Sequence, residues 1–184
     1  MQGAAHGTAG GISPRPSTKI PAMFILIVGA GRVGSSLARA MLKDGHEVSC
    51  LDEDPESQAR LAVGMERAWE DSGGQFTVGT GLEVDALLAA GIERADAFVA
   101  ATDGDNTNIV ISQIARRRFG VPTVIARVLD PLRAEWYEQQ GLHTICPTRV
   151  AIEMLQTEVR EAAEKQQVRE GAGARADGST RGDG

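Results

Sequence analysis

Residues 24–34 read FILIVGAGRVG, and this stretch decides the fold. Phe24–Val28 is a continuous apolar run of β-favouring residues, the pattern of a strand covered on both faces. A Gly-x-Gly-x-x-Gly turn follows at once, and the apolar residues Leu37 and Met41 then recur at helical spacing. The turn consists of Gly29, Ala30, Gly31, Arg32, Val33 and Gly34. A strand, this turn and a helix in direct succession predict a phosphate-binding unit.

Each glycine of the turn has a distinct expected role. Gly29 permits a tight turn, Gly31 lets the backbone approach a pyrophosphate, and Gly34 lets the helix pack closely on the strand. The start of the helix offers free N–H groups and positive potential to phosphates, and Arg32 adds a positive charge there. The competing interpretation is a glycine-rich turn that binds no ligand.

An acidic residue stands where the second half of a dinucleotide-binding unit requires one. Asp52 ends a second predicted strand, residues 47–51, about 20 residues beyond the glycine turn. Its carboxylate is expected to accept hydrogen bonds from ribose hydroxyls and to repel a 2′-phosphate, which disfavours NADP. Glu53 shares this role in one interpretation, whereas Asp54, followed by Pro55, is expected to cap the next helix.

Strand-like and helix-like segments alternate along the rest of the chain. Further strands are expected at 76–78, 97–101, 123–128 and 142–146, with helices between them. Repeated βα units of this length predict an α/β fold: a single Rossmann-like, doubly wound parallel sheet of about six strands, spanning residues 23–147.

The carboxyl ends of the later strands should complete the ligand site, because ligands bind beyond those ends in such sheets. The sequence there supplies Thr80, Gly81, Ala101, Thr102 and Arg127. Arg127 either reaches a phosphate or pairs with an acid, and the sequence leaves both open. Asp103 or Asp105 is expected to cap the helix that follows the fourth strand.

Both ends of the chain are expected to be disordered, because residues 1–22 and 166–184 contain few bulky apolar side chains. Residues 148–165 predict a helix with Val150, Met154, Leu155 and Val159 on one face. That face packs either on its own sheet or on a partner. The apolar run before the glycine turn, about ten residues, is too short to span a membrane.

Composition excludes several functions. The 184-residue chain carries a net charge of −6, which gives no electrostatic footprint for nucleic acid. Its two cysteines, Cys50 and Cys146, lie in apolar runs without a nearby histidine cluster, so no metal site is expected. An NAD-dependent oxidoreductase would need a general acid or base near the nicotinamide. Tyr137 has no lysine four residues on, and His143 lies in a short strand, so no catalytic residue is expected.

Several motifs together resemble one known family. GAGRVG is followed by LDEDPE, VGTGLEVDALLAAGIERADAFVAAT, DGDNTNIVISQIARRRFGVPTVIARVLDP and QGLHTICPT, in order and at fitting separations. These motifs resemble the N-terminal RCK (TrkA-N) domain of Trk/Ktr-type potassium-uptake regulators over about residues 24–158. Thr80 departs from the pattern, because an acid often follows the first glycine after the third strand in this family.

The resemblance implies a cytosolic regulatory subunit that binds NAD(H) or ATP/ADP and lies against the inner face of the cell membrane. It implies a membrane potassium transporter subunit as partner, and homodimers or a higher ring joined through residues 148–165. A second regulator carrying a C-terminal RCK lobe is a further expected partner. The other interpretations are an oxidoreductase and a nucleotide-sensing regulator of another cation channel or exchanger.

Overall fold

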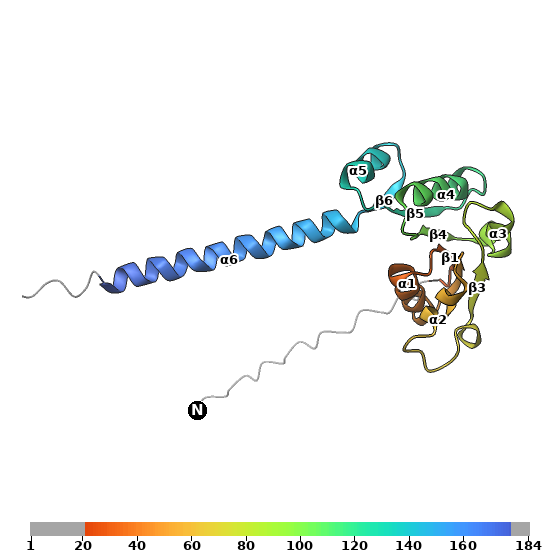
Figure 1. The fold of residues 1–184 in the computed structure, drawn as a ribbon, viewed down its shortest axis with the longest axis horizontal. Helices are drawn as coiled ribbons and strands as arrows, with labels where there is room; N and C mark the ends of the chain where they lie inside the picture. Colours follow the sequence, from red (N-terminus) through yellow and green to blue (C-terminus); the bar gives the residue numbers. More distant parts are fainter. Residues whose placement is uncertain (1–20, 178–184) are drawn as a thin grey trace, which may run out of the picture.

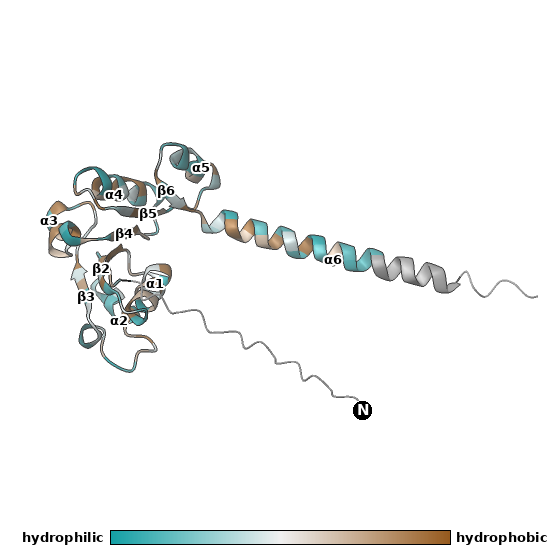
Figure 2. Ribbon diagram, turned by 180° about the vertical axis from the view of Figure 1, so that it is seen from behind, coloured by the Kyte–Doolittle hydropathy of each residue, from teal (hydrophilic) through white to brown (hydrophobic). Residues whose placement is uncertain are grey.

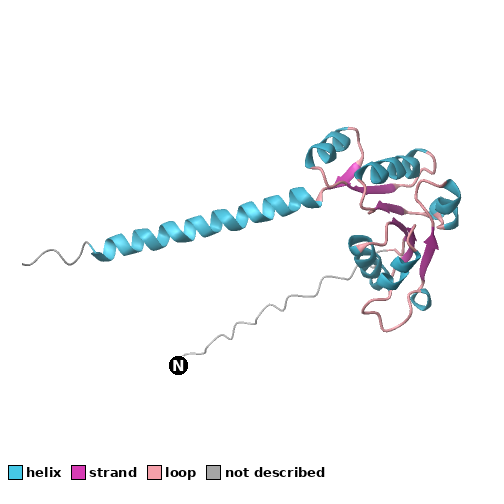
Figure 3. Cartoon of the chain, in the orientation of Figure 1, coloured by secondary structure: helices cyan, strands magenta, loops and turns pink. Residues whose placement is uncertain are grey.

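The computed structural model describes residues 21–177, and its centre is one six-stranded parallel sheet (Figures 1 and 3). The strands are β1 Phe24–Val28, β2 Glu47–Asp52, β3 Gly74–Val78, β4 Ala97–Ala100, β5 Thr123–Arg127 and β6 His143–Ile145. Their order is β3-β2-β1-β4-β5-β6, and every neighbouring pair is parallel. The strand order reverses between β1 and β4, so the predicted doubly wound sheet is confirmed.

Helices connect successive strands and cover both faces of the sheet. They are α1 Arg32–Lys43, α2 Gln58–Leu61, α3 Val84–Ala89, α4 Asp105–Arg117, α5 Pro131–Gln139 and α6 Pro147–Asp177, with short 3-10 turns η1 Pro55–Ser57, η2 Glu70–Ser72 and η3 Ile92–Arg94. In Figure 1, α1 and α2 lie on one side of the sheet, and α4 and α5 on the other. Among the described residues, no helix is both long and apolar enough to cross a membrane.

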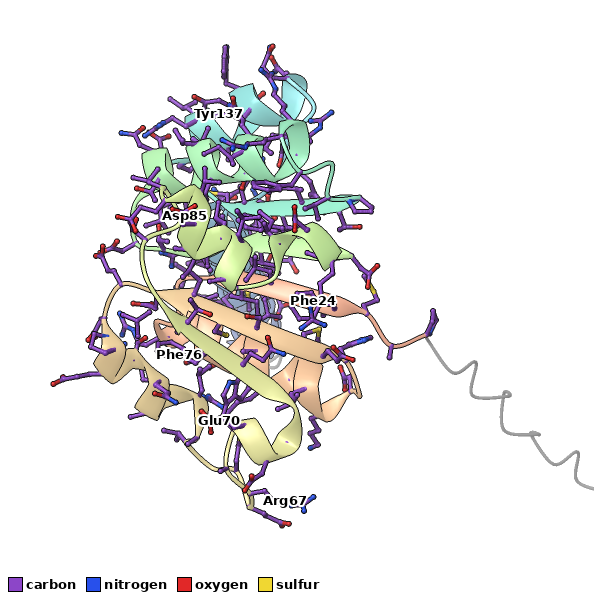
Figure 4. All side chains as sticks on the ribbon, turned by 90° about the vertical axis from the view of Figure 1, so that its right-hand side faces the viewer. Phe24, Arg67, Glu70, Phe76, Asp85 and Tyr137 are labelled. Carbon is purple, nitrogen blue, oxygen red and sulfur yellow. The ribbon has the colours of Figure 1, made fainter. Side chains whose placement is uncertain are left out.

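Alternate residues of β1 pack into two separate cores, because successive side chains of a strand point to opposite faces. Leu26 and Val28 join the core under α3, α4 and α5, whereas Ile25 and Ile27 join the core under α1 and α2. All five residues of β1 are buried, as the unbroken apolar run predicts. Figure 4 shows side chains filling both layers, from Tyr137 on α5 to Glu70 in η2.

Capping residues fix where two of the helical segments begin. Asp130 precedes α5, and its carboxylate accepts from Leu132 N at 2.9 Å and Arg133 N at 3.3 Å. Asp54 caps η1 and accepts from Glu56 N at 2.9 Å, as the sequence predicted. The expected cap of α4 is wrong, because Gly104 occupies that position and no side chain caps the helix.

The last helix, α6, leaves the sheet and projects away from it (Figure 1). It spans 31 residues, about 46 Å of helix. The helix was expected to end near Lys165 and to be followed by a disordered tail, but it continues through residues 166–177, which corrects that expectation. Strong helix formers, including Ala162, Ala163 and Gln167, lead the helix past that boundary. The predicted disorder of residues 1–20 and 178–184 lies outside the described residues.

Candidate nucleotide-binding site

The glycine turn packs directly against the carboxyl end of β4. Gly29 has φ +100°, a conformation that favours glycine, and its N–H donates to Leu51 O at 2.8 Å. A Cβ at Gly29 would lie 2.7 Å from Ala101 C and Thr102 N, so a larger residue would collide with backbone. The first predicted glycine role, a tight turn, is therefore required by this structure.

The other two glycines of the turn have opposite surroundings. A Cβ at Gly34 would lie 1.8 Å from the carbonyl oxygen of Gly29, so α1 packs against the turn at backbone distance. A Cβ at Gly31 would meet nothing within 4 Å. Gly31 is the N-cap of α1, no side chain caps the helix there, and Arg32 and Val33 are exposed. The start of α1 therefore faces open space, with the positive end of the helix available to an anion.

Asp52 reaches back from the end of β2 to the glycine turn. Its Oδ2 accepts from Ala30 N at 2.5 Å, and its Oδ1 accepts from Asp54 N at 2.9 Å. The carboxylate is half-buried and, among the described residues, forms no ion pair. Glu53, the next residue, is exposed. Asp52 therefore holds its carboxylate directly beside the glycine turn.

The segment after β3, Gly79–Gly81, packs against the carboxyl ends of β1 and β2. Gly79 N donates to Asp52 O at 2.9 Å, which extends the β2–β3 ladder into the turn. A Cβ at Gly81 would lie 2.8 Å from Val28 Cγ1, so glycine is needed for this close approach. Thr80, between the two glycines, has its hydroxyl 3.4 Å from Leu82 N. This segment lies against the ends of β1 and β2.

A polar network joins the ends of β4 and β5, and its centre is Asn108, which the sequence analysis did not single out. The side chain of this α4 residue bonds Thr102 and Arg127 at distances of 2.7 to 2.9 Å. Arg127 Nη2 donates to Thr102 O at 2.6 Å. Within the described residues Arg127 forms no ion pair with an acid, and its guanidinium donates to a backbone carbonyl instead.

A helical spacing in the sequence could have revealed Asn108. Asn108, Ile111, Ser112 and Ala115 recur at the spacing of one helix face, and all four are buried. Val110, an apolar residue of the same helix, lies off this face and is exposed.

Asp105, one of the two expected caps, has a different partner. Its two carboxylate oxygens accept from Leu129 N at 2.8 Å and Asp130 N at 3.1 Å. Asp105 therefore ties the start of α4 to the loop between β5 and α5, instead of capping its own helix.

The described part of the chain shows no arrangement of side chains suited to a metal ion. No group of three or more His, Cys, Asp or Glu side chains could hold a metal there. Burial, with a smaller contribution from Asp52, raises the pKa of the Cys50 thiol to about 12. The thiol is therefore protonated and unreactive at neutral pH.

A shallow hollow of about 360 Å³ lies elsewhere, between α2 and η2. Pro55, Gln58, Ala62, Trp69 and Glu70 are among the residues that line it. It includes no residue of the glycine turn, of the Gly79–Gly81 segment or of the network around Asn108. We therefore locate the candidate site by the backbone geometry of the turn and by Asp52, not by this hollow.

Comparison with known proteins places the chain in a family. The family model described as the TrkA-N domain matches residues 25–148. A Trk system potassium uptake protein TrkA from Streptomyces coelicolor is 43% identical over 143 residues. The match covers 77% of this chain and 61% of that relative, so this chain corresponds to about three fifths of its length.

Solved structures share the fold at low sequence identity. The TrkA-N domain of the Escherichia coli inner membrane protein ybaL has a TM-score of 0.61 at 19% identity, over 74% of this chain and 97% of that one. The Shewanella denitrificans Kef CTD in its AMP-bound form has a TM-score of 0.57 at 22% identity, over 83% and 96%. The GsuK channel bound to NAD has a TM-score of 0.53 at 19% identity, over 72% and 22%. With the family match over residues 25–148, these findings confirm the resemblance seen in the motifs: the chain belongs to the TrkA-N domain family.

Proposed function

We propose that this chain is a nucleotide-binding regulatory module of a Trk-type potassium uptake system. The single observation that carries the proposal is the open backbone at Gly31, where a Cβ would meet nothing within 4 Å and no side chain caps α1. An uncapped helix start beside open space suits a phosphate group. The name of the Streptomyces relative supports the link to potassium uptake.

NAD(H) and ATP or ADP are the proposed gating ligands. Structural neighbours of the same fold are described as bound to AMP, ADP or NAD, which supports an adenine nucleotide without selecting one. Asp52 supplies the acceptor for ribose hydroxyls, and its charge opposes a 2′-phosphate. The segment with Thr80 and Gly81 borders the adenine side, and the segment with Ala101 and Thr102 forms the floor below the glycine turn.

A regulatory role fits the rest of the site better than a catalytic one. The relatives are named as potassium uptake proteins. The described site offers Asp52, Thr102 and Arg127, and each is already engaged in holding the turn or the strand ends. We therefore propose that the bound nucleotide acts as a signal to a membrane transporter subunit on the cytoplasmic side.

We further propose that α6 joins two copies of the chain. Residues 150–167 are all exposed, the apolar ones among them. Met154, Leu155 and Val159 are 66%, 66% and 69% exposed. Figure 2 shows apolar and polar residues interspersed along this helix. This exposure argues against packing of the apolar face on its own sheet, and a second copy is the surface that we propose for it.

Calorimetry with NADH, ATP and ADP tests the proposed function on the wild type and on Gly31→Asp. The open space lets the fold accept the aspartate, but its carboxylate would repel the phosphates. Like charges about 4 Å apart near a protein surface cost about 4 kcal/mol, so binding should weaken at least ~100-fold.

Ala40→Asp is the matched control, because it adds the same charge to an exposed position further along α1. It should bind nucleotide as the wild type does. Equal affinities of Gly31→Asp and the wild type would show that the nucleotide does not bind at the glycine turn. Absence of binding by the wild type would overturn the proposed function itself.

A further inference from the structure

The side-chain amide of Asn108 uses all of its hydrogen-bonding capacity at the candidate site. Its Oδ1 accepts from Thr102 N at 2.9 Å and from Thr102 Oγ1 at 2.7 Å. Its Nδ2 donates to Thr102 O and to Arg127 O, both at 2.9 Å. The partners fix the orientation of the amide, because the backbone N–H needs an acceptor and the two carbonyls need donors. Asn108 is fully buried, at 0% exposure, on the helix behind the two strand ends.

This arrangement decides the hydrogen-bonding character of the Thr102 hydroxyl. A hydroxyl has one proton, and Asn108 Oδ1 can only accept, so Thr102 Oγ1 must be the donor in the 2.7 Å bond. The alternative acceptor, Gly104 O, lies at 3.5 Å and is the weaker partner. Thr102 is half-buried beside the turn at Gly29. Gly104 N donates to one lone pair of Thr102 Oγ1 at 3.4 Å, so the hydroxyl can offer its other lone pair to a ligand, but not its proton.

The same amide also holds the chain segment that carries Arg127. Thr102 O receives both Asn108 Nδ2 and Arg127 Nη2, so the guanidinium is anchored to the carbonyl that Asn108 positions. Arg127 Nε is shielded from solvent and has no hydrogen-bond partner, and no described carboxylate forms an ion pair with Arg127. The positive charge at the end of β5 is therefore left without a counter-charge from the described chain.

We propose that Asn108 is a positioning residue of the nucleotide site. It makes the Thr102 hydroxyl an acceptor for a donor group of the nucleotide, either a ribose hydroxyl or an amide N–H, and it holds the Arg127 charge at the ends of the strands. The inference rests on the proposed function and adds to it a specific contact and the residue behind that contact.

Two substitutions at Thr102 test the acceptor role. Thr102→Val keeps the branched shape and removes the hydroxyl, so ADP and NADH should bind about 5- to 10-fold more weakly. Thr102→Ser keeps a hydroxyl and should bind more tightly than Thr102→Val. A loss for both ligands assigns the donor to the adenosine half, and a loss for NADH alone assigns it to the nicotinamide half. Wild-type affinity of Thr102→Val for both ligands would overturn the inference.

Substitutions on α4 test whether Asn108 acts through Thr102. Asn108→Ala should weaken binding at least ~10-fold, and adding Thr102→Val to it should cause no further loss, because interacting residues are not additive. Ile109→Ala is the matched control: it truncates the neighbouring buried side chain on the same helix and should lower the melting temperature while affinity stays within about twofold. Ser112→Ala removes a buried hydroxyl without a partner and should change neither quantity.

The outcomes separate the inference from the proposed function. Additive losses in the double variant, or equal losses of affinity for Asn108→Ala and Ile109→Ala at similar melting temperatures, would show that Asn108 is merely structural. Should Asn108→Ala not fold, Asn108→Ser, which keeps one polar group, replaces it in the same cycle. No binding by the wild type would overturn both proposals, whereas wild-type binding that Thr102→Val leaves unchanged would overturn this one alone.

Discussion

The sheet lobe (β1 to β6 with α1 to α5) and the helix α6 differ in how well their side chains are packed within this chain. In the lobe, the turn is packed to backbone contact at Gly29 and Gly34, and the ends of β4 and β5 are joined by a saturated amide. In α6, by contrast, residues 150–167 are exposed throughout. The difference indicates that the packing around the glycine turn is complete within one chain, whereas the apolar residues of α6 remain exposed, and we propose a second copy as the surface that covers them.

A substitution at Gly34 should destabilise the sheet lobe more than any of the other substitutions proposed. Gly34→Ala would place a methyl group 1.8 Å from Gly29 O, so backbone must move and the free energy of unfolding should fall by at least about 3 kcal/mol. Gly31→Ala, in the same turn, meets open space and should change stability by less than about 0.5 kcal/mol. Urea unfolding of both variants measures the contrast, and equal losses would contradict the packing described for the turn.

Substitutions at Met154 and Leu155 test whether the exposed apolar residues of α6 form a dimer interface. Replacing both with aspartate should convert a dimer into a monomer that still binds nucleotide, because charges in an apolar interface must be desolvated without partners. Light scattering measures the mass, and calorimetry the affinity. The control is Gln156→Asp with Arg160→Asp, on the opposite side of the helix, which should remain dimeric.

Two results would contradict this prediction. A double aspartate variant that remains dimeric places the interface elsewhere on the chain. A variant that unfolds shows that the helix stabilises its own lobe, despite the exposure of its apolar residues.

Strand positions could be predicted well, because a strand buried on both faces must be apolar throughout. Phe24–Val28 shows this directly, and every predicted strand boundary lies within two residues of the observed one. The end of α6 could not be predicted, because residues 166–177 contain both helix formers and glycine, and composition alone does not decide between a helix and a tail.

The glycine turn and Asp52 could be predicted because their spacing is set by the strand–turn–helix unit itself. Asn108 and Asp105 were missed or misassigned for a common reason. Each bonds residues about 20 positions further along the chain, at Arg127 and at Leu129 respectively. Such partners meet only after β4 and β5 are paired, so a local helical pattern can mark Asn108 as buried but cannot reveal what it bonds.

A substitution at Asp52, in the sheet lobe, should have a smaller effect, on the affinity for nucleotide. Asp52→Ala removes a charged acceptor beside the turn, so NADH should bind about tenfold more weakly. The loss of the negative charge should also narrow the preference for NADH over NADPH. Competition calorimetry with the two dinucleotides measures both changes. A wild type that prefers NADPH would contradict the ribose role, and Glu53→Gln, at the exposed neighbour, is the control for general charge effects.

The ion pair that connects the sheet lobe to α6 should have the smallest effect on stability. Glu138 on α5 accepts from Thr144 Oγ1 at 2.9 Å and pairs with Arg149, in the first turns of α6, at 3.0 Å. The hydrogen bond from Arg149, then that from Thr144, lowers the pKa of Glu138 below its ordinary value. A carboxyl whose pKa is lower in the folded state stabilises the fold above its unfolded pKa, and this contribution is lost as pH falls through the folded pKa.

Glu138→Gln should therefore lower the melting temperature slightly at neutral pH, and the gap from the wild type should close as pH falls below about 4.5. High salt should also narrow the gap, because the ion pair is solvent-exposed and screened. Hydrogen exchange at residues 149–153 should speed up in the variant if the pair holds the root of α6 against α5. Glu161→Gln, which removes the exposed Glu161–Lys165 pair within α6, is the matched control and should leave that exchange unchanged. A gap that persists at low pH would mean that the Glu138 side chain acts through packing and not through its charge.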